Sequence, residues 1–279
     1  MNSLLSLRFE AREGRTVLRL DSQQPPWRVV RAFPNSCGEA LIHLHNVSGG
    51  VLTNDDLRLQ VDVGPEARAQ ITTAGATRVY RSRAAGATAR QQNVVTVRER
   101  GLLEYVPDAL IPYAGSRFEQ STAIEVLDQA TLFWWDLVAP GREAAGEIFA
   151  YDVLSSSLDL RVDGVPAAAE RFVLEPRRRH PASAARLGNF RYFASLYVCR
   201  SGFGRPAWLE LEAQLGAIAE ELSSPGDVLW GVSTLAASGL VVRGIAREGR
   251  QLARGMPVFW TAAKWSLCGR VAVIPRKIN

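Results

Sequence analysis

Apolar and polar residues alternate in short runs from Leu4 to about Val198, and glycine, proline, asparagine and aspartate residues separate these runs. The clearest run covers residues 57–63, where apolar side chains occupy the odd positions and polar side chains the even positions. A period of two is typical of a strand that buries one face. Similar runs predict strands over residues 40–46, 67–72, 92–97, 118–126, 147–153, 158–163 and 190–198.

The periodicity changes after Pro206. Apolar residues then recur at helical spacing, at Leu211, Leu215, Ile218 and Leu222, and the sequence Ser-Ser-Pro-Gly at 223–226 follows them. This pattern predicts one amphipathic helix from about Pro206 to residue 222. Two more strands are predicted over residues 228–235 and 240–245.

A second helical region is predicted from about residue 248 to residue 267. The spacing of Phe259, Trp260, Ala263 and Leu267 supports its second half. Pro257 is expected to kink or divide this helix, because proline has no backbone N–H and its ring crowds the preceding turn.

The predicted fold class is therefore mainly β, with two C-terminal α-helical segments. The spacing of the strands fits a sandwich, a barrel or a stacked coil, and no fixed-period repeat marks a solenoid. The pattern alone favours a β-sandwich. We find no serine- or glycine-rich linker, so we expect a single domain over 1–279, β-rich over 1–200 and helix-containing over 201–279.

The composition, with 47% hydrophobic and 22% charged residues, is ordinary for a globular protein. The net charge of +5 allows an anionic partner. The one tight basic cluster is Arg177, Arg178 and Arg179, between two prolines; it is either a solvated loop or a docking patch for an acidic protein. No nucleic-acid-binding motif is present, so a basic nucleic-acid-binding module is a weaker alternative.

Cys37, Cys199 and Cys268 lie far apart and form no C-x-x-C pair, so we expect buried or incidental thiols and no zinc site. The N-terminal residues do not resemble a signal peptide. No run reaches the ~18 to 20 apolar residues of a membrane helix. We expect a cytoplasmic protein that does not bind a membrane.

The sequence does not predict an enzyme. It has three histidines, no G-x-S-x-G elbow and no phosphate-binding loop. The alternative is a carbohydrate-active enzyme with paired carboxylates, built on a β-solenoid or a β-sandwich. Its candidate pairs are Glu104 with Asp108 and Asp136 with Glu147.

The stretch from His43 to Ser82 carries the most specific pattern in the chain. A histidine-containing strand leads into an N-x-x-G-G turn with an acidic end, then into a strand ending in V-G-P, and then into T-T-x-x-A-T-x-V-Y-R-S. The matching residues are His45, Asn46, Gly49, Gly50, Asp55, Gly64, Thr72, Thr73, Ala76, Thr77, Val79, Tyr80, Arg81 and Ser82. This stretch resembles the urease accessory protein D family, also called UreD or UreH.

Two residues depart from that pattern. Asn54 stands where the family usually has glycine, and Arg78 stands where it usually has lysine. Asparagine tolerates positive φ better than most residues, and arginine keeps the charge. Further segments resemble the family in the same order along the chain, at residues 104–108, 111–113, 140–142, 146–149 and 275–278.

The resemblance implies an irregular β-helix-like stack of short strands in place of a sandwich. It also implies a urease maturation factor, a nickel-insertion scaffold or metallochaperone that binds apo-urease and the accessory F and G proteins. Nickel would then be in transit, with no cofactor bound tightly. The GTP chemistry would belong to the accessory G protein.

Several side chains are candidate metal contacts, and each also has a structural interpretation. His43 and His45 share one face of a predicted strand, and imidazoles suit nickel, but they also form structural hydrogen bonds. Asp55 and Asp56 end a Gly-Gly turn, which they either stabilise or use to pass a hydrated cation. Glu147 is either paired with Arg142 or a buried carboxylate on a nickel route. Glu104, Asp108 and Asp136 share that ambiguity.

Overall fold

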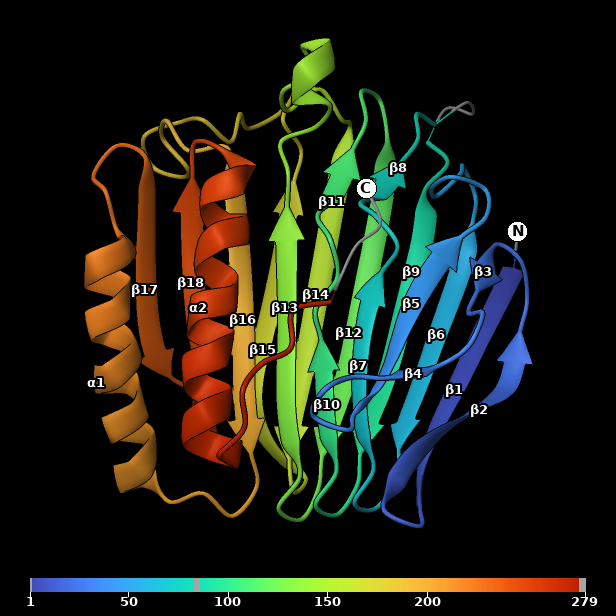
Figure 1. Cartoon of the computed structure of the whole chain (residues 1–279). Helices are drawn as coiled ribbons and strands as arrows, with labels where there is room; N and C mark the ends of the chain where they lie inside the picture. The colour runs from blue at the N-terminus through green and yellow to red at the C-terminus, as the bar shows by residue number, and fades with distance from the viewer. Residues whose placement is uncertain (1, 83–85, 276–279) are drawn as a thin grey trace.

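The computed structural model describes residues 2–82 and 86–275 of the chain. Two β-sheets lie face to face, and two helices cover part of the outer face of one of them (Figure 1). Sheet 1 runs, from edge to edge, through β15 (Val165–Leu174), β14 (Val153–Val162), β12 (Arg117–Val126), β9 (Ala89–Val97), β6 (Asp56–Val63), β1 (Asn2–Arg12) and β2 (Arg15–Gln23).

Sheet 2 is the longer sheet. It runs through β17 (Val228–Thr234), β18 (Gly239–Ala246), β16 (Tyr192–Arg200), β13 (Thr131–Val138), β10 (Leu102–Tyr105), β7 (Arg68–Thr73), β5 (Ala40–Asn46) and β3 (Trp27–Arg28). Three short strands extend it, β4 (Phe33–Pro34), β8 (Thr77–Val79) and β11 (Leu110–Pro112). The helices are α1 (Arg205–Leu222) and α2 (Gly249–Cys268), and Glu143–Ala145 form one 3-10 turn.

From β5 to β14 the longer strands alternate between the two sheets. β6, β9, β12 and β14 are parallel neighbours in sheet 1, and β5, β7, β10 and β13 are parallel neighbours in sheet 2. Successive turns of the chain therefore stack beside one another, as a coiled path requires. Antiparallel hairpins flank this region, so both sheets are mixed. The mainly-β prediction with two late helices is confirmed.

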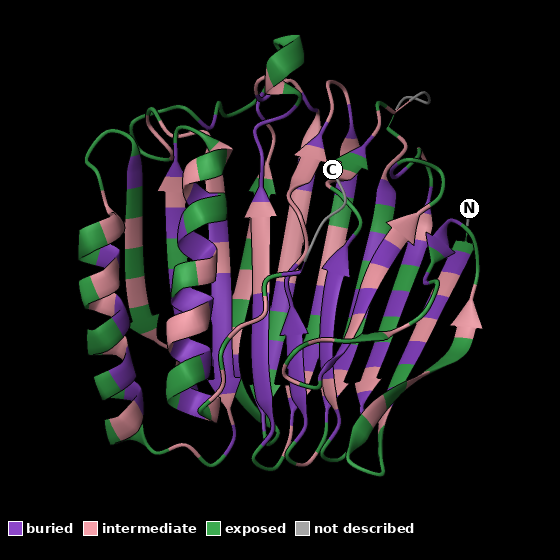
Figure 2. Cartoon of the chain, viewed as in Figure 1, coloured by how far each residue is buried: buried purple, intermediate pink, exposed green. Residues whose placement is uncertain are grey.

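The main core lies between the sheets, and period-two alternation fills it. Leu57, Leu59, Val61 and Val63 all point inward and are at most 3% exposed. The polar residues between them point to solvent, where Arg98 forms an ion pair with Asp62 at 2.7 Å. Figure 2 shows the same alternation of buried and exposed residues along the strands. This is the face assignment that the sequence predicts for residues 57–63.

A second core lies between sheet 2 and the helices. α1 packs on β17, and α2 packs on β16 and β18. The predicted stripe of α1 is buried at Leu211 and Leu215, and α2 buries Trp260 and Phe259 against the sheet. Sheet 2 therefore has apolar side chains on both faces, which explains the nearly continuous apolar run in β13.

Pro257 does not divide α2, which runs through it as one helix; Ala253, whose carbonyl loses its helical N–H partner there, is exposed and can reach water. The strand predicted over residues 147–153 is wrong. Residues 147–152 form bends and irregular segments, and β14 begins only at Val153. Gly141 and Gly146 adopt positive φ, and a Cβ on Gly141 would lie 2.3 Å from the Glu147 carbonyl oxygen, so the chain folds back tightly before this point.

The other predicted strands agree with the structure to within a few residues. The prediction over 40–46 coincides with β5, and the prediction over 92–97 falls short of the start of β9 at Ala89. The matching C-terminal residues 276–278 lie outside the described residues. In the part of the chain that the structure describes, no helix combines the length and the apolar character needed to cross a bilayer.

A buried ionic cluster joins α2 to sheet 2. The Nζ of Lys264 lies 3.0 Å from Glu39 Oε1 and 2.9 Å from Glu104 Oε1, and all three side chains are fully buried. Trp260 also donates its indole N–H to Glu104 Oε1 at 2.8 Å. Burial raises the pKa of Glu104 to about 7, against the attraction of Lys264. Burial lowers the pKa of Lys264, but the two carboxylates together outweigh it and leave the pKa raised, so the lysine stays charged.

Glu104→Gln should change how stability depends on pH. The folded-state pKa of Glu104 lies above its unfolded value, so its favourable contribution is complete below about pH 4 and is lost as pH rises through about 7. The wild-type protein should therefore lose up to about 3 kcal/mol relative to Glu104→Gln between pH 4.5 and pH 8. Urea unfolding followed by tryptophan fluorescence at several pH values measures this difference. Parallel stability curves for the two proteins would contradict it.

Candidate functional site

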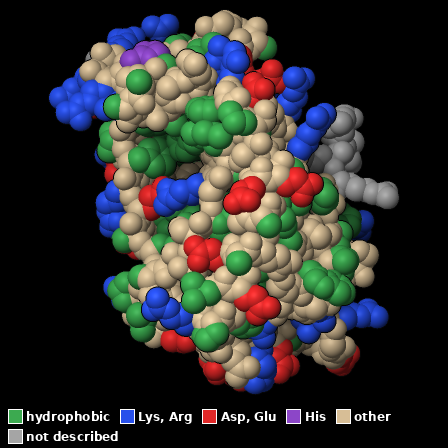
Figure 3. All heavy atoms as spheres, turned by 90° about the vertical axis from the view of Figure 1, so that its left-hand side faces the viewer, with side chains coloured by type: hydrophobic (Ala, Val, Ile, Leu, Met, Phe, Trp, Pro, Cys, Tyr) green, Lys and Arg blue, Asp and Glu red, His purple; other side chains and the backbone are tan. Residues whose placement is uncertain are grey.

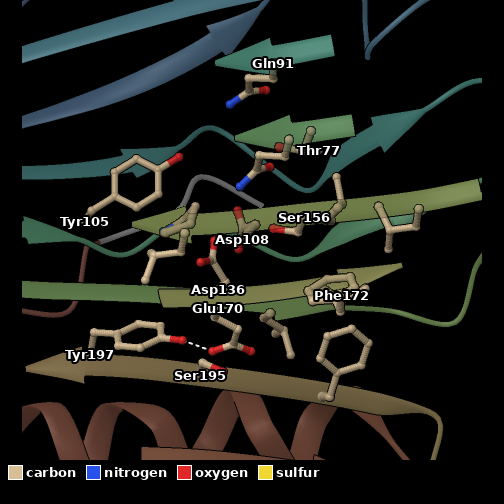
Figure 4. A pocket seen from close by; sticks show the side chains of 18 residues that line it. Thr77, Gln91, Tyr105, Asp108, Asp136, Ser156, Glu170, Phe172, Ser195 and Tyr197 are labelled. Atoms are coloured by element: carbon tan, nitrogen blue, oxygen red, sulfur yellow. Dashed lines mark hydrogen bonds between the residues drawn. The ribbon is translucent and has the colours of Figure 1, made fainter. Parts of the chain in front are cut away.

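A cavity of about 80 Å³ with both polar and apolar walls lies between the two sheets, with room for several water molecules. Polar side chains interrupt the inward-facing apolar rows there and point into it from both sheets (Figure 4). Sheet 1 contributes Gln91, Gln120, Ser156 and Glu170, and sheet 2 contributes Tyr105, Asp136, Ser195 and Tyr197. Asp108, which follows β10, completes the polar wall.

Asp136 is the central acidic group of the cavity. β13 presents it inward, and its Oδ2 accepts a hydrogen bond from the Trp134 indole at 3.0 Å. Trp134 in turn stacks on Tyr105, with ring centroids 3.9 Å apart, which holds the donor in place. Burial raises the pKa of Asp136 to about 6; the Trp134 hydrogen bond opposes this effect and the nearby charge of Glu170 adds to it. A half-buried carboxylate with a raised pKa and a neutral donor marks a candidate functional site.

Glu170 is the second cavity carboxylate, and it connects the sheets. It lies on β15 and accepts two hydrogen bonds from Arg243 of β18, at 3.0 and 2.9 Å. The Tyr197 hydroxyl of β16 also donates to it. Asp136 and Glu170 therefore place two carboxylates on one small volume, with the charge of Glu170 offset by Arg243, and such oxygen ligands suit a divalent cation more than an anion.

A second hollow, of about 220 Å³, adjoins the first. Thr77 and Gln91 line both, and His45 and the Gly49-Gly50 turn line the second hollow. The Gly50 position is crowded: a Cβ there would lie 2.5 Å from the carbonyl oxygen of Arg78, so this turn requires glycine. The motif at residues 43–82 thus forms a wall of the second hollow.

The predicted metal candidates lie in different environments. His43 and His45 are half-buried on one face of β5, opposite the buried Ile42, so they occupy the less apolar side as predicted. His45 lines the second hollow. Asp55 is buried and accepts the backbone N–H of Leu52 at 2.8 Å, which closes the turn. Asp56 starts β6 on the outer face, 3.4 Å from Arg58.

Glu147 and the arginine cluster lie outside the cavity. Glu147 pairs with Arg142, as the sequence suggests, and accepts the Ala114 N–H at 3.0 Å. The hydrogen bonds from Arg142 lower the pKa of Glu147. The three arginines at 177–179 lie in an exposed turn, where Arg178 pairs with Glu175 at 2.9 Å. The metal and docking roles of these residues stay predictions.

The carboxylate pairs considered for a carbohydrate-active enzyme do not share a site. Glu104 faces α2, whereas Asp108 lines the cavity between the sheets. Asp136 lines the cavity, whereas Glu147 closes a turn with Arg142. Within residues 2–82 and 86–275, no group of three or more His, Cys, Asp or Glu side chains is placed to hold a metal ion.

Several site residues were missed by reasoning from the sequence. Glu170, Tyr197 and Arg243 come from strands far apart in the chain. A signal was present for Glu170: it shares an inward face with Ala168, Phe172 and Leu174, where a charged residue is unexpected. Lys264 and Glu39 lie 225 residues apart, and no local pattern connects them.

Comparisons with known proteins agree with one another. The model of the family described as UreD urease accessory protein matches residues 2–279. A urease accessory protein UreD from Herpetosiphon aurantiacus is 41% identical over 278 residues, covering 100% of this chain and 96% of that protein. UreD 2 of Brucella abortus is 28% identical over 279 residues, covering 96% and 88%. UreD of Photorhabdus laumondii is 29% identical over 274 residues, covering 95% and 82%.

The family model and these relatives define the class: an accessory protein of metallocentre assembly, which is not itself a catalytic enzyme. The chain belongs to the UreD urease accessory protein family, and its role lies in urease maturation. The family resemblance carried by residues 43–82 is confirmed.

Asp55→Ala should destabilise the fold, whereas Asp56→Ala should not. Asp55 is buried and leaves the Leu52 N–H without its acceptor when truncated, which should lower the free energy of unfolding by about 1–3 kcal/mol. Asp56 makes an exposed ion pair, so its loss should change stability by less than about 1 kcal/mol. Urea denaturation of both variants measures the contrast. Equal stabilities would argue against a turn-closing role for Asp55.

Proposed function

We propose that this protein is a nickel-insertion scaffold that binds apo-urease and passes nickel through the cavity between its sheets. The observation that carries the proposal is the pair of inward-facing carboxylates, Asp136 and Glu170, on the cavity between the sheets, in a core that is mainly apolar. Oxygen ligands exchange a hydrated divalent cation more readily than thiolates do, which suits transit better than storage. Nickel is the cargo here and is not a resident cofactor.

The adjoining hollow extends the route that we propose. Thr77 and Gln91 supply polar atoms where the two hollows meet. His45, on the wall of the second hollow, is a further nickel contact in this proposal, because imidazole is a good nickel ligand. At each position along this route, nickel then needs only one or two protein ligands, and water completes its coordination shell.

We infer that the accessory F and G proteins are the other partners, with GTP hydrolysis performed by the G protein. The arginines at 177–179 are a candidate docking patch. The side chains of Arg177 and Arg178 are 78% and 77% exposed. Their ion pairs lie at the surface and are weak, so the acidic groups of a partner can replace the present carboxylates. The cysteines are free thiols, which suits a cytoplasmic place of action.

Asp136→Asn and Glu170→Gln test this function. Each chain should be co-expressed with the urease subunits and the accessory F and G proteins, and nickel-dependent urease activity and co-purification should be measured together. Both substitutions remove a negative charge without changing shape, so urease activation should fall roughly tenfold or more while co-purification is kept.

Asp159→Asn is the matched control. Asp159 is 53% exposed on the outer face of β14 and pairs with Arg171 at 3.0 Å. It should leave activation unchanged. Wild-type activation by both cavity variants would overturn the proposed route. If this protein does not co-purify with urease and urease is still activated, the scaffold role itself fails.

A further inference from the structure

Sheet 2 is wider than sheet 1 at one side of the molecule. β15 is the last strand of sheet 1 there, whereas sheet 2 continues past β16 into β18 and β17. Phe172 of β15 packs on Phe193 of β16, with ring centroids 5.5 Å apart, and among the described residues no strand follows β15 in sheet 1. Sheet 2 therefore overhangs sheet 1, and part of its inner face has no strand opposite it.

The overhanging inner face carries a row of apolar side chains. Phe193, Ile245 and Leu229 are direct neighbours across β16, β18 and β17. Phe172 covers Phe193, but Ile245 is only half-buried and Leu229 is 38% exposed. The residues on either side of Leu229 in β17 pack against the helices, so Leu229 itself points to the side of sheet 1. This row has the direction of core residues and lacks their cover.

The uncovered area is bounded at both ends. At one end Arg243 reaches across to Glu170 at 2.9 Å, and beyond this pair the Ala236 N–H donates to the Ala167 carbonyl at 3.3 Å, so the loop after β17 covers that part of β15. At the other end residues 175–191 connect β15 to β16. Figure 3 views this side and shows a hollow between the layers, lined by hydrophobic side chains, with a basic and an acidic side chain next to each other below it.

The free edge of β15 lies beside this hollow. β15 pairs with β14 along one edge, and at residues 170–174 its other edge meets no strand in the part of the chain that the structure describes. An unpaired edge offers N–H and C=O groups to an extended chain, which would continue sheet 1 at ~4.8 Å from β15. Such a chain would lie over β18 and place alternate side chains on Ile245 and Leu229.

The rim of the hollow is basic. The connection between β15 and β16 carries Arg177, Arg178, Arg179 and Arg186. Arg177 and Arg178 have surface carboxylates beside them, whereas Arg179 and Arg186 are exposed and form no ion pair within the described residues. Arg186 donates to the carbonyl of Arg179 at 2.7 Å, which keeps these two side by side. An extended segment with acidic residues at this end matches both the hollow and its rim.

A second copy of this chain does not fit the edge. Antiparallel pairing of two β15 strands would continue sheet 1 from one copy into the other. Because β18 and β17 extend beyond β15 in each copy, the overhanging strands of both copies would then occupy the same space. Glu170 also points inward on this edge strand, and an inward charge discourages pairing between like edges.

We propose that the β15 edge and the overhanging inner face of β18 and β17 bind an extended segment of a partner protein, which adds a strand to sheet 1. The inward side chains of this segment are apolar and contact Ile245 and Leu229, and its acidic residues face the basic connection. This inference rests on the proposed function for the identity of the partner, a urease subunit or an accessory protein. The chemistry of the segment follows from the surface alone.

Leu229→Glu tests the apolar part of this surface. Leu229 is partly exposed, so the variant should fold, and its carboxylate would lie where an apolar side chain of the partner binds. The full-length chain should be co-expressed with the urease subunits and the accessory F and G proteins. Co-purification of the partner that uses this surface should fall roughly tenfold or more. Leu229→Ser, a smaller change, replaces this variant if it does not fold.

Val173→Glu is the matched control. Val173 is 61% exposed on the outer face of the same edge strand, so the same charge there should leave co-purification unchanged. If a folded Leu229 variant retains every partner at the wild-type level, the docking surface is wrong.

Amide hydrogen exchange shows whether a strand is added. The amides of residues 170–174 that point to the free edge should exchange about tenfold or more slowly in the purified complex than in the free chain, because new hydrogen bonds protect them. Exchange in β2, at the opposite edge of sheet 1, should not change. Equal exchange of residues 170–174 in the free chain and in the complex overturns strand addition. Protection that grows with the concentration of the isolated chain overturns the partner protein in favour of a second copy.

The two proposals fail in different ways. Wild-type urease activation by Asp136→Asn and Glu170→Gln overturns the nickel route, whatever happens at the β15 edge. Full co-purification of Leu229→Glu with unchanged exchange at residues 170–174 overturns the added strand, whatever the activation is. A wild-type chain that co-purifies with none of these proteins overturns both the scaffold and the added strand.

Discussion

The interior between two facing sheets depends on side chains that alternate along each strand. Sheets that pack face to face lie about 10 Å apart, so every inward position of one sheet meets an inward position of the other. Because successive turns of the chain are parallel neighbours, similar inward rows stack from β6 to β14. A polar residue in such a row has no route to solvent through the sheet, and several of them together create a polar cavity.

Interior carboxylates have different partners in the two cores. Between sheet 2 and α2, the charged Lys264 forms ion pairs with Glu39 and Glu104, and this cluster fixes the helix on the sheet. Between the sheets, Asp136 has a neutral indole donor instead, and its pKa is raised. Burial raises the pKa of both Glu104 and Asp136, but Glu104 faces a charged lysine, whereas Asp136 faces a neutral donor and the carboxylate of Glu170.

Prediction from the sequence succeeded where a single strand or helix carries its own signal. The alternation at residues 57–63 identified the buried face of β6, and the apolar stripe from Leu211 to Leu222 identified α1. It failed at residues 147–152, where a positive-φ glycine turn and the Arg142–Glu147 pair override a weak strand pattern. At Pro257 the sequence left open whether the helix is kinked or divided; burial on both sides of the proline keeps α2 undivided.

The sequence by itself determined the family, the strand faces and the two late helices, since these depend on residue types at short spacing. It named Asp108 and Asp136 among several acidic candidates without ranking them. Tertiary structure decided which carboxylates meet. Asp136, Glu170 and Arg243 converge because β13, β15 and β18 are brought together by pairing between distant strands. The pKa of a carboxylate depends on burial and on charges from those strands, and neither quantity is present in the local sequence.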